Sequence, residues 1–103
     1  MDATVADNAD RHRYEIEIDG TIAGTIDYRG HGAVRTFRHT EVDPAFAGRG
    51  VGTELIRRSL DDARAHGLHV VPVCPFVRAF LHQHPDYLDL VEARHRRAFG
   101  LPL

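Results

Sequence analysis

The sequence predicts a mixed α/β fold, of the α+β kind, in which an antiparallel β-meander is followed by one strand–helix–strand unit and by C-terminal helices. Polar and apolar residues alternate strictly from Tyr14 to Asp19, which is typical of a half-buried strand. Farther along, an apolar stripe with helical spacing precedes a nearly continuous apolar run at 68–74. A strand, a helix and a second strand in this order indicate a parallel crossover.

The chain has 103 residues, 43% of them hydrophobic, which is enough for one globular domain with one core. Residues 1–10 are polar and acidic and show no period, so we expect a flexible leader there. The single domain is then expected to span residues 11–103.

A hairpin is expected at the start of the domain. Its first strand buries one face, which carries Tyr14, Ile16 and Ile18. Asp19-Gly20 is a two-residue turn signal. The returning strand at 21–29 places Ile22, Ile26 and Tyr28 on one face and is broken by the glycines at 30–32.

A third strand is predicted at 34–42, where β-branched and aromatic residues are frequent, and it ends at Asp43-Pro44. Because side chains alternate along a strand, His39 and Glu41 are expected on the same face.

An amphipathic helix follows the glycine-rich stretch at 48–52 and is closed by Gly67. Its buried face is predicted to carry Leu55, Ile56, Ser59, Leu60 and Ala63. The strand at 68–74 should lie parallel to the strand at 34–42 and be buried on both faces. Pro75 then begins a short helix that stops near His84-Pro85, and a last helical piece covers about 87–98.

Composition excludes several functional classes. The formal charge of −2 does not favour nonspecific binding to nucleic acid or to an anionic membrane. The longest apolar run is far too short to span a bilayer, and the N-terminus lacks the pattern of a signal peptide, so we expect a cytoplasmic protein. The single cysteine cannot form an internal disulfide, and the pairs His66/His69 and His82/His84 lack a third ligand, so we expect no metal.

The run Gly48-Arg49-Gly50-Val51-Gly52-Thr53 lies between a strand and a helix N-terminus, where free N–H groups and the helix dipole favour an anion such as phosphate. Each glycine weakens a helix start by about 0.5–1 kcal/mol, a cost that close approach of a ligand would explain. Two other phosphate loops do not fit, because the chain has no Lys for a P-loop and Thr53 stands where GxGxxG needs Gly. The alternative is a plain glycine loop without a ligand.

This run resembles the acyl-CoA pyrophosphate loop of the GNAT superfamily of N-acetyltransferases, usually written Gln/Arg-x-x-Gly-x-Gly/Ala after a strand that ends in a Val-x-Pro-like turn. Val42-Asp43-Pro44 and the glycines at 48, 50 and 52 carry the likeness. The resemblance extends over roughly residues 12–92, including Val71-Pro72-Val73-Cys74-Pro75 and His84-Pro85, and is closest to the short single-domain branch of the superfamily.

The resemblance implies a minimal GNAT-like fold and transfer of acetyl from acetyl-CoA to an amine. It implies that Glu41 and Val42 line the pantetheine arm. It further implies that the pyrophosphate is bound by the loop and its amides at Gly48, Arg49, Gly50, Val51, Gly52 and Thr53.

The chain departs from the family pattern at three places. Ala47 replaces the usual Gln or Arg of the loop. The Asn-x-x-Ala-x-x-x-Tyr pattern of the later helix maps onto Phe76, Ala79 and Gln83, so the tyrosine that commonly protonates the departing CoA thiolate is absent. The helices between the first strands and the final hairpin, which typically build the acceptor site in the family, are absent as well.

Cys74 is the first candidate for the chemistry. It ends the strand parallel to the one that carries His39 and Glu41, where ligands of open sheets bind. A cysteine just before a helix can be activated as a nucleophile by the helix dipole, and we therefore hypothesise a transient acetyl-Cys74 intermediate. The alternative is a buried small hydrophobic residue.

His39 and Glu41 are candidate general bases for the amine, and His39 is also a candidate base for Cys74. The alternative for each is a solvent-exposed strand side chain without a role.

Three functions therefore remain open from the sequence. The leading hypothesis is an N-acetyltransferase that uses acetyl-CoA as cosubstrate and an unidentified amine as acceptor. The second is a non-catalytic acyl-CoA binding or sensing module, and the third is a protein-interaction domain whose glycine loop is fortuitous. The sequence does not fix the acceptor or the oligomeric state.

Overall fold

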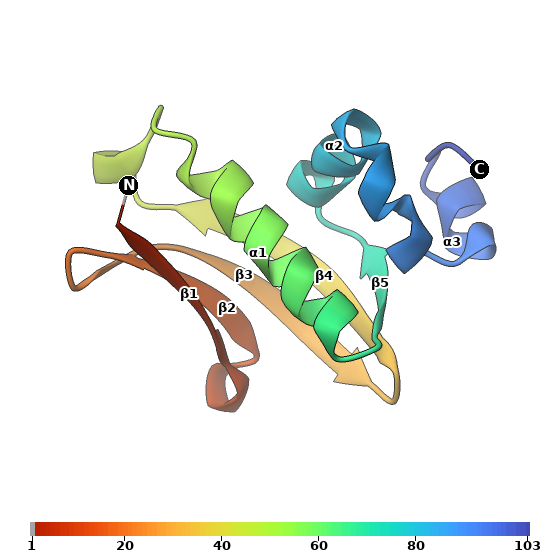
Figure 1. Cartoon of the computed structure of the whole chain (residues 1–103), viewed down its shortest axis with the longest axis horizontal. Helices are drawn as coiled ribbons and strands as arrows, with labels where there is room; N and C mark the ends of the chain where they lie inside the picture. Colours follow the sequence, from red (N-terminus) through yellow and green to blue (C-terminus); the bar gives the residue numbers. More distant parts are fainter. Residues whose placement is uncertain (1) are drawn as a thin grey trace.

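In the computed structural model, which describes residues 2–103, five strands form one sheet in the order β1-β2-β3-β4-β5. They are β1 (Ala3–Asn8), β2 (Arg13–Ile18), β3 (Thr21–His31), β4 (Val34–Val42) and β5 (His69–Pro72). The first four pair antiparallel, and β5 pairs with β4 in parallel. Helix α1 (Val51–Ala65) lies across the sheet, while α2 (Pro75–Gln83) and α3 (Ala93–Ala98) gather beside β5 (Figure 1). The predicted α/β class and its meander-then-crossover order are confirmed.

Residue 1 of the leader expected at 1–10 lies outside the described residues, and for the rest the expectation of flexibility is wrong, because β1 is an integral strand of the sheet. It pairs with β2 in continuous register from Ala3↔Ile18 to Asn8↔Arg13. Ala3 and Val5 are half-buried against the core, whereas the residues between and after them are mostly exposed. An edge strand that contributes only two small apolar side chains gives a weak alternation signal in the sequence. Because β1 is paired with β2, the folded part of the chain begins before residue 11.

The turn between β2 and β3 has the geometry that the sequence predicts. Asp19 and Gly20 have φ angles of 51° and 79°, so both lie in the left-handed region that a tight two-residue hairpin turn requires. The predicted inward face of β2, with Tyr14, Ile16 and Ile18, is buried.

A bulge in β3 overturns one expected core residue. Ile22 pairs with Glu17 and Gly24 pairs with Ile16, so Ala23 is the extra residue between them. Ala23 is fully buried, whereas Ile22 is 39% exposed. The period of two that placed Ile22 with Ile26 is interrupted at this bulge.

A second bulge lies in β4. Asp27 pairs with His39 and Tyr28 pairs with Phe37, which leaves Arg38 as the extra residue. Phe37 is buried, while Arg38 and His39 are both exposed although they are consecutive. From His39 onward the alternation resumes, so His39 and Glu41 share the exposed face as predicted.

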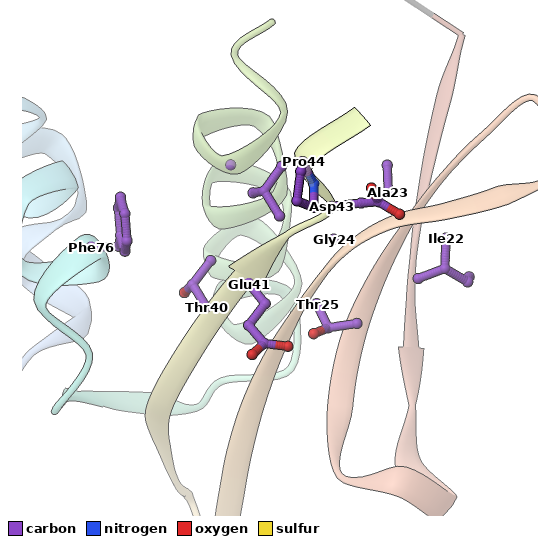
Figure 2. Close-up of a pocket in the computed structure, with 11 residues that line it drawn as sticks. Ile22, Ala23, Gly24, Thr25, Thr40, Glu41, Asp43, Pro44 and Phe76 are labelled. Carbon is purple, nitrogen blue, oxygen red and sulfur yellow. The ribbon is translucent and has the colours of Figure 1, made fainter. Parts of the chain in front are cut away.

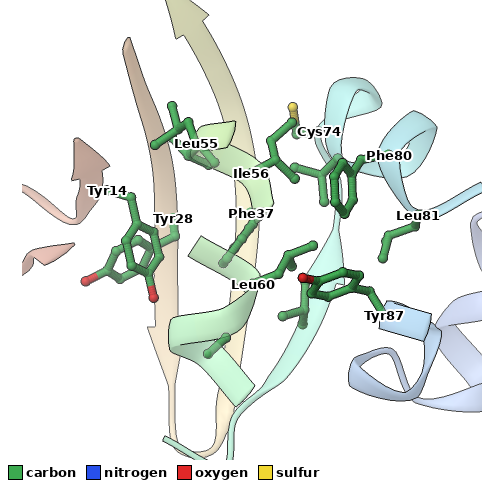
Figure 3. Close-up of a cluster of buried hydrophobic side chains, with 14 of the residues drawn as sticks. Tyr14, Tyr28, Phe37, Leu55, Ile56, Leu60, Cys74, Phe80, Leu81 and Tyr87 are labelled. Atoms are coloured by element: carbon green, nitrogen blue, oxygen red, sulfur yellow. The ribbon is translucent and has the colours of Figure 1, made fainter. Parts of the chain in front are cut away.

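Helix α1 is the predicted amphipathic helix. All five residues expected on its buried face are buried, together with Val51. The apolar ones among them, without Ser59, pack in one cluster with the inward side chains of the sheet, among them Tyr14 and Phe37 (Figure 3). Gly67 follows the helix with a φ of 67°, as expected for a glycine that ends a helix.

The C-terminal helical piece expected at 87–98 is divided in two. A 3-10 helix spans Pro85–Leu90, and α3 begins only at Ala93. Between them Val91 and Glu92 have extended ψ angles of 120° and 148°. Val91 is 1% exposed, so burial of its side chain accompanies the interruption of the helix.

A half-buried polar cluster, which we call the Arg35 cluster, joins four strands to α1. Its members are Asp7, Tyr14, Tyr28, Arg35 and Asp62. Arg35 Nη1 donates to the Tyr14 hydroxyl at 2.6 Å and to Asp7 at 3.4 Å. The hydroxyls of Tyr14 and Tyr28 donate to Asp62 and Asp7, each at 2.6 Å. The Arg35 guanidinium lies 4.3 Å from the centroid of the Tyr28 ring, so one cation bridges strands that are distant in the sequence.

Alkaline pH is expected to destabilise the fold through this cluster. Burial, and then the hydrogen bond to Asp7, raise the pKa of Tyr28 from 10 to about 12, and the pKa of Tyr14 is raised as well. The contribution is fully present below pH 10 and is lost as pH rises towards 12, because the unfolded chain releases its phenolic protons first. Tyr28 alone should account for about 2 kcal/mol of this loss.

Urea unfolding at pH 9, 10, 11 and 12 measures this dependence, and Tyr28→Phe should flatten it. The absence of lysine removes the group that usually titrates in the same range. A wild-type unfolding free energy that stays constant up to pH 12 would contradict the expectation.

Candidate functional site

The sheet opens between β4 and β5. Their parallel pairing runs from Val34↔His69 to Phe37↔Pro72, and the N–H of Cys74 donates to the Phe37 carbonyl at 2.9 Å. Strand β5 is therefore shorter than the 68–74 expected, and Val73 beyond it is 42% exposed. In the described part of the chain, β4 continues past Phe37 without a strand on this side.

Backbone groups of β4 face this opening. The N–H of Asp43 donates to the Ala23 carbonyl on β3 at 2.8 Å. Successive residues of a strand direct their N–H and C=O groups to opposite neighbours, so the backbone groups of Glu41, like those of Asp43, point towards β3. The backbone groups of Thr40 and Val42 then point to the side where β5 has ended and are available to a ligand.

Two adjoining cavities form one groove along β4, which we call the β4 groove. The first, of about 670 Å³, lies beside the start of β3 and the C-terminal end of β4 (Figure 2). The second, of about 380 Å³, lies between the glycine turn, the start of α1 and one face of α2. Val42, Gly52 and Phe76 line both cavities, so the groove is continuous from Glu41 to the start of α1.

The glycine turn exposes backbone amides at the end of the groove. Gly48 and Gly50 have φ angles of 78° and 74°, which side-chain-bearing residues rarely adopt. Gly50 is the N-cap of α1 and offers no capping side chain, and the first helical bond runs from Glu54 N–H to Gly50 at 3.1 Å. The N–H groups at 51–53 precede that bond and have no acceptor within the helix. This is the arrangement that binds phosphate groups.

Most residues that the sequence predicts for cofactor binding meet in the groove. The second cavity is lined by Val42, Gly48, Gly50, Val51, Gly52 and Thr53, and the first by Glu41. Arg49 is not among the lining residues, and its guanidinium lies 5.4 Å from the centroid of the Phe46 ring.

One face of α2 closes the groove opposite the glycine turn. Phe76, Ala79 and Gln83, the three positions that the resemblance mapped onto the family's helix pattern, all line the second cavity. Their spacing of three and four residues places them on one side of the helix. Gln83 therefore occupies the wall where the resemblance would have placed a tyrosine hydroxyl.

Cys74 lies behind the groove rather than in its wall. Its side chain is 1% exposed and packs with the buried cluster that includes Ile56 and Phe80 (Figure 3). The sulfur lies 3.3 Å from the Thr40 hydroxyl, and it lines neither cavity of the groove. In this structure Cys74 is a packed core residue at the N-cap of α2.

His39 and Glu41 lie together on the exposed face of β4. His39 Nε2 is 3.2 Å from a carboxylate oxygen of Glu41, and both side chains are more than half exposed. Glu41 lines the groove, whereas His39 lines a separate cavity. The two candidate bases therefore contact one another and flank the opening of the sheet.

Within residues 2–103, no group of three or more His, Cys, Asp or Glu side chains is placed to hold a metal ion. In the same part of the chain, no helix has both the length and the apolar character needed to cross a membrane.

Comparison with known proteins identifies the family. The family model described as GCN5-related N-acetyl-transferase matches residues 13–90, which include β4, the glycine turn and α2. The chain belongs to this family. Membership supports an acetyltransferase role for the chain. No curated protein matches the sequence.

Solved structures of other proteins share this fold. A GCN5-like candidate N-acetyltransferase from Staphylococcus aureus, solved by NMR, matches 86% of this chain and 87% of its own with a TM-score of 0.65 and 22% identity. Ard1 from Thermoplasma volcanium, a crystal structure, matches with a TM-score of 0.51 and 21% identity. That match covers 59% of this chain and 43% of the Ard1 chain.

Sequence reasoning missed the β3 side of the groove and its apolar rim. Gly24 and Thr25 line the first cavity because the start of β3 pairs with the end of β4 there. Ile22 and Phe76 line it as well and are 39% and 67% exposed. An aromatic residue on the first turn of α2, outside the helix's buried stripe, was the one available signal.

Proposed function

We propose that this chain binds acetyl-CoA in the β4 groove and transfers its acetyl group to an amine. The observation that carries the proposal is that the free N–H groups at the start of α1 and the unpaired edge of β4 belong to one continuous groove. Amides at a helix start suit a pyrophosphate, and the unpaired backbone of Thr40 and Val42 suits the amide groups of a pantetheine arm. Phe76 offers apolar contact to the arm.

In the proposed reaction a neutral amine attacks the thioester carbonyl at the opening between β4 and β5. The new C–N bond forms, the C–S bond breaks, and the departing group leaves as the CoA thiolate. His39 or Glu41 accepts the proton that the amine loses, since both flank the opening. Gln83 cannot supply a proton to the thiolate as a tyrosine would, so solvent is the proposed proton source there.

Titration of isotope-labelled protein with acetyl-CoA, followed by amide NMR, tests the binding step. We expect saturable shifts of the signals of residues 40–42 and 48–53, and no shifts of the signals of α3. Unchanged spectra at millimolar acetyl-CoA would contradict the proposal and favour an interaction domain. Binding without thiol release in the presence of any amine would instead favour the acyl-CoA sensing module.

A second route would pass through an acetyl-Cys74 intermediate. The contact between Cys74 and Thr40 favours it, because Thr40 belongs to the unpaired edge of β4. Attack by the thiol requires that it be uncovered, since the side chain is 1% exposed.

We therefore expect direct transfer, with no acetyl adduct on Cys74 after incubation with acetyl-CoA and with activity retained in Cys74→Ser. Intact and peptide mass spectrometry provides the first measurement, and thiol release the second. An adduct on Cys74 that an added amine discharges, together with an inactive Cys74→Ser, would establish the covalent route.

A further inference from the structure

A third cavity, of about 490 Å³, lies on the face of the sheet opposite α1. Asp27 and Arg29 line it from β3, where they are exposed and alternate with the buried Ile26 and Tyr28. Because buried residues of β3 point towards α1, the alternating exposed ones point to the other face. This cavity is separate from the β4 groove and takes no part in the acetyl-CoA site proposed above.

The cavity is strongly basic. Three arginines, Arg11, Arg29 and Arg38, line it together with His12 and His39, and Asp27 is its one acidic residue. No salt bridge or side-chain hydrogen bond within residues 2–103 involves the side chains of these three arginines. None of the three is therefore held in an ion pair within the described chain, and Asp27 is the one acidic residue that lines the cavity with them.

This concentration of free arginines is unlike the rest of the molecule. Eight of the chain's 13 arginines have a carboxylate or an aromatic ring as partner: 13, 35, 49, 57, 58, 64, 78 and 94. Among the described residues, Arg96 and Arg97 on α3 are the others without such a partner. Three of the five arginines that are left therefore share one cavity.

The bulge in β4 places Arg38 in this cavity. Without the extra residue, Arg38 and His39 would point to opposite faces of the strand. With it, both are exposed and both line the cavity. The same bulge follows Phe37, the last residue of β4 paired with β5, so the basic cavity begins where the sheet opens.

One wall of the cavity lies at the opening between β4 and β5. Val73, which follows β5, lines the cavity together with His39. His39 in turn contacts Glu41, which lines the β4 groove. A molecule held in the cavity would therefore reach the opening from the face opposite α1, while the groove holds its ligand along the end of β4 and the start of α1.

From this arrangement we infer that the acetyl acceptor is an amine that also carries an anionic group, a carboxylate or a phosphate, and that Arg29 and Arg38, with Arg11, bind that group. The inference rests on the proposed function. Guanidinium groups bind the oxygens of either anion through charge-assisted hydrogen bonds. With the anion held by the arginines, the amine lies towards His39 and Glu41.

Matched amines test the substrate class. Thiol release from acetyl-CoA is measured at constant ionic strength with β-alanine, 2-aminoethyl phosphate, propylamine and putrescine. We expect kcat/KM for the better of the two anionic amines to exceed that for propylamine and putrescine by about tenfold or more. The comparison of β-alanine with 2-aminoethyl phosphate distinguishes a carboxylate from a phosphate.

Variants assign the effect to the cavity. The double variant Arg29→Gln/Arg38→Gln should raise KM for the anionic amines by about tenfold, with kcat and the propylamine rate unchanged. Arg97→Gln is the matched control, because it removes another arginine without a partner, on α3. This variant should change neither KM nor kcat for any of the amines. Equal rates for anionic, neutral and cationic amines, or equal losses in the double variant for all of them, would overturn the inference.

A binding measurement separates this inference from the proposed function. In protein saturated with acetyl-CoA, the anionic amines should shift the amide signals of residues 27–29 and 38–39, and the double variant should lose these shifts. If no amine releases thiol, absence of these shifts overturns the anionic site. Shifts at 48–53 with acetyl-CoA alone report separately on the cofactor site.

Discussion

Replacing Gly52 by Glu is expected to abolish acetyl-CoA binding while leaving the fold at least as stable as the wild type. Gly52 lies in the first turn of α1 and lines both cavities of the β4 groove. A carboxylate there would stand among the amides proposed to bind the pyrophosphate. Repulsion between charges a few ångströms apart in a partly desolvated groove should raise Kd by about 100-fold or more.

The same carboxylate should favour the helix itself. Acidic side chains in the first turn of a helix stabilise it by about 0.3–1 kcal/mol, and replacing a helical glycine adds a similar amount. A Cβ at position 52 would meet Val42 Cγ2 at 3.4 Å, which is an ordinary contact. Stability and binding should therefore change in opposite directions.

Gly52→Gln is the matched control, because it has the same shape without the charge. Isothermal titration calorimetry with acetyl-CoA should give a Kd for the Gly52→Gln variant between those of the wild type and the Gly52→Glu variant. Urea unfolding should show the Gly52→Glu variant to be no less stable than the Gly52→Gln variant. Equal Kd values for Gln and Glu would mean that the pyrophosphate does not lie at the start of α1.

Replacing Arg35 by Met is expected to destabilise the fold by about 3 kcal/mol. The substitution keeps much of the apolar stem and removes the cation shared by Tyr14 and Asp7. The Arg35 side chain is 18% exposed, and Asp7 and Asp62 would be left half-buried without their positive partner. A charge that loses its partner in such surroundings costs more than an exposed pair is worth.

Arg94→Met is the control for this prediction. Arg94 is 72% exposed and lies 3.8 Å from Glu92, so its loss should cost less than about 0.5 kcal/mol. Urea unfolding at pH 7 compares the two variants. Similar unfolding free energies would show that the Arg35 cluster does not hold the strands to α1.

Much of the fold could be predicted because its signals are local. The alternation in β2, the stripe of α1 and the turn at Asp19-Gly20 each arise from the geometry of a few consecutive residues. The glycine turn could be predicted for the same reason, since a left-handed residue before a helix start is a local requirement.

The errors in the strands have one origin, which is pairing between distant segments. Strand β1 is held by β2 and contributes few apolar side chains, so its own sequence barely indicates a strand. Ile22 was misplaced because the bulge at Ala23 is a property of two paired strands. The exposed position of Arg38 beside His39 depends on the second bulge for the same reason.

By itself, therefore, the sequence determined the α/β class, the order of most elements, the amide-rich turn before α1 and the family resemblance. The tertiary structure alone decided that β5 ends early and opens the sheet, that Cys74 is packed behind the groove, and that three free arginines share a cavity on the opposite face. Helical periods and turns depend on short-range geometry, whereas strand register, bulges and shared cavities depend on contacts between residues far apart in the chain.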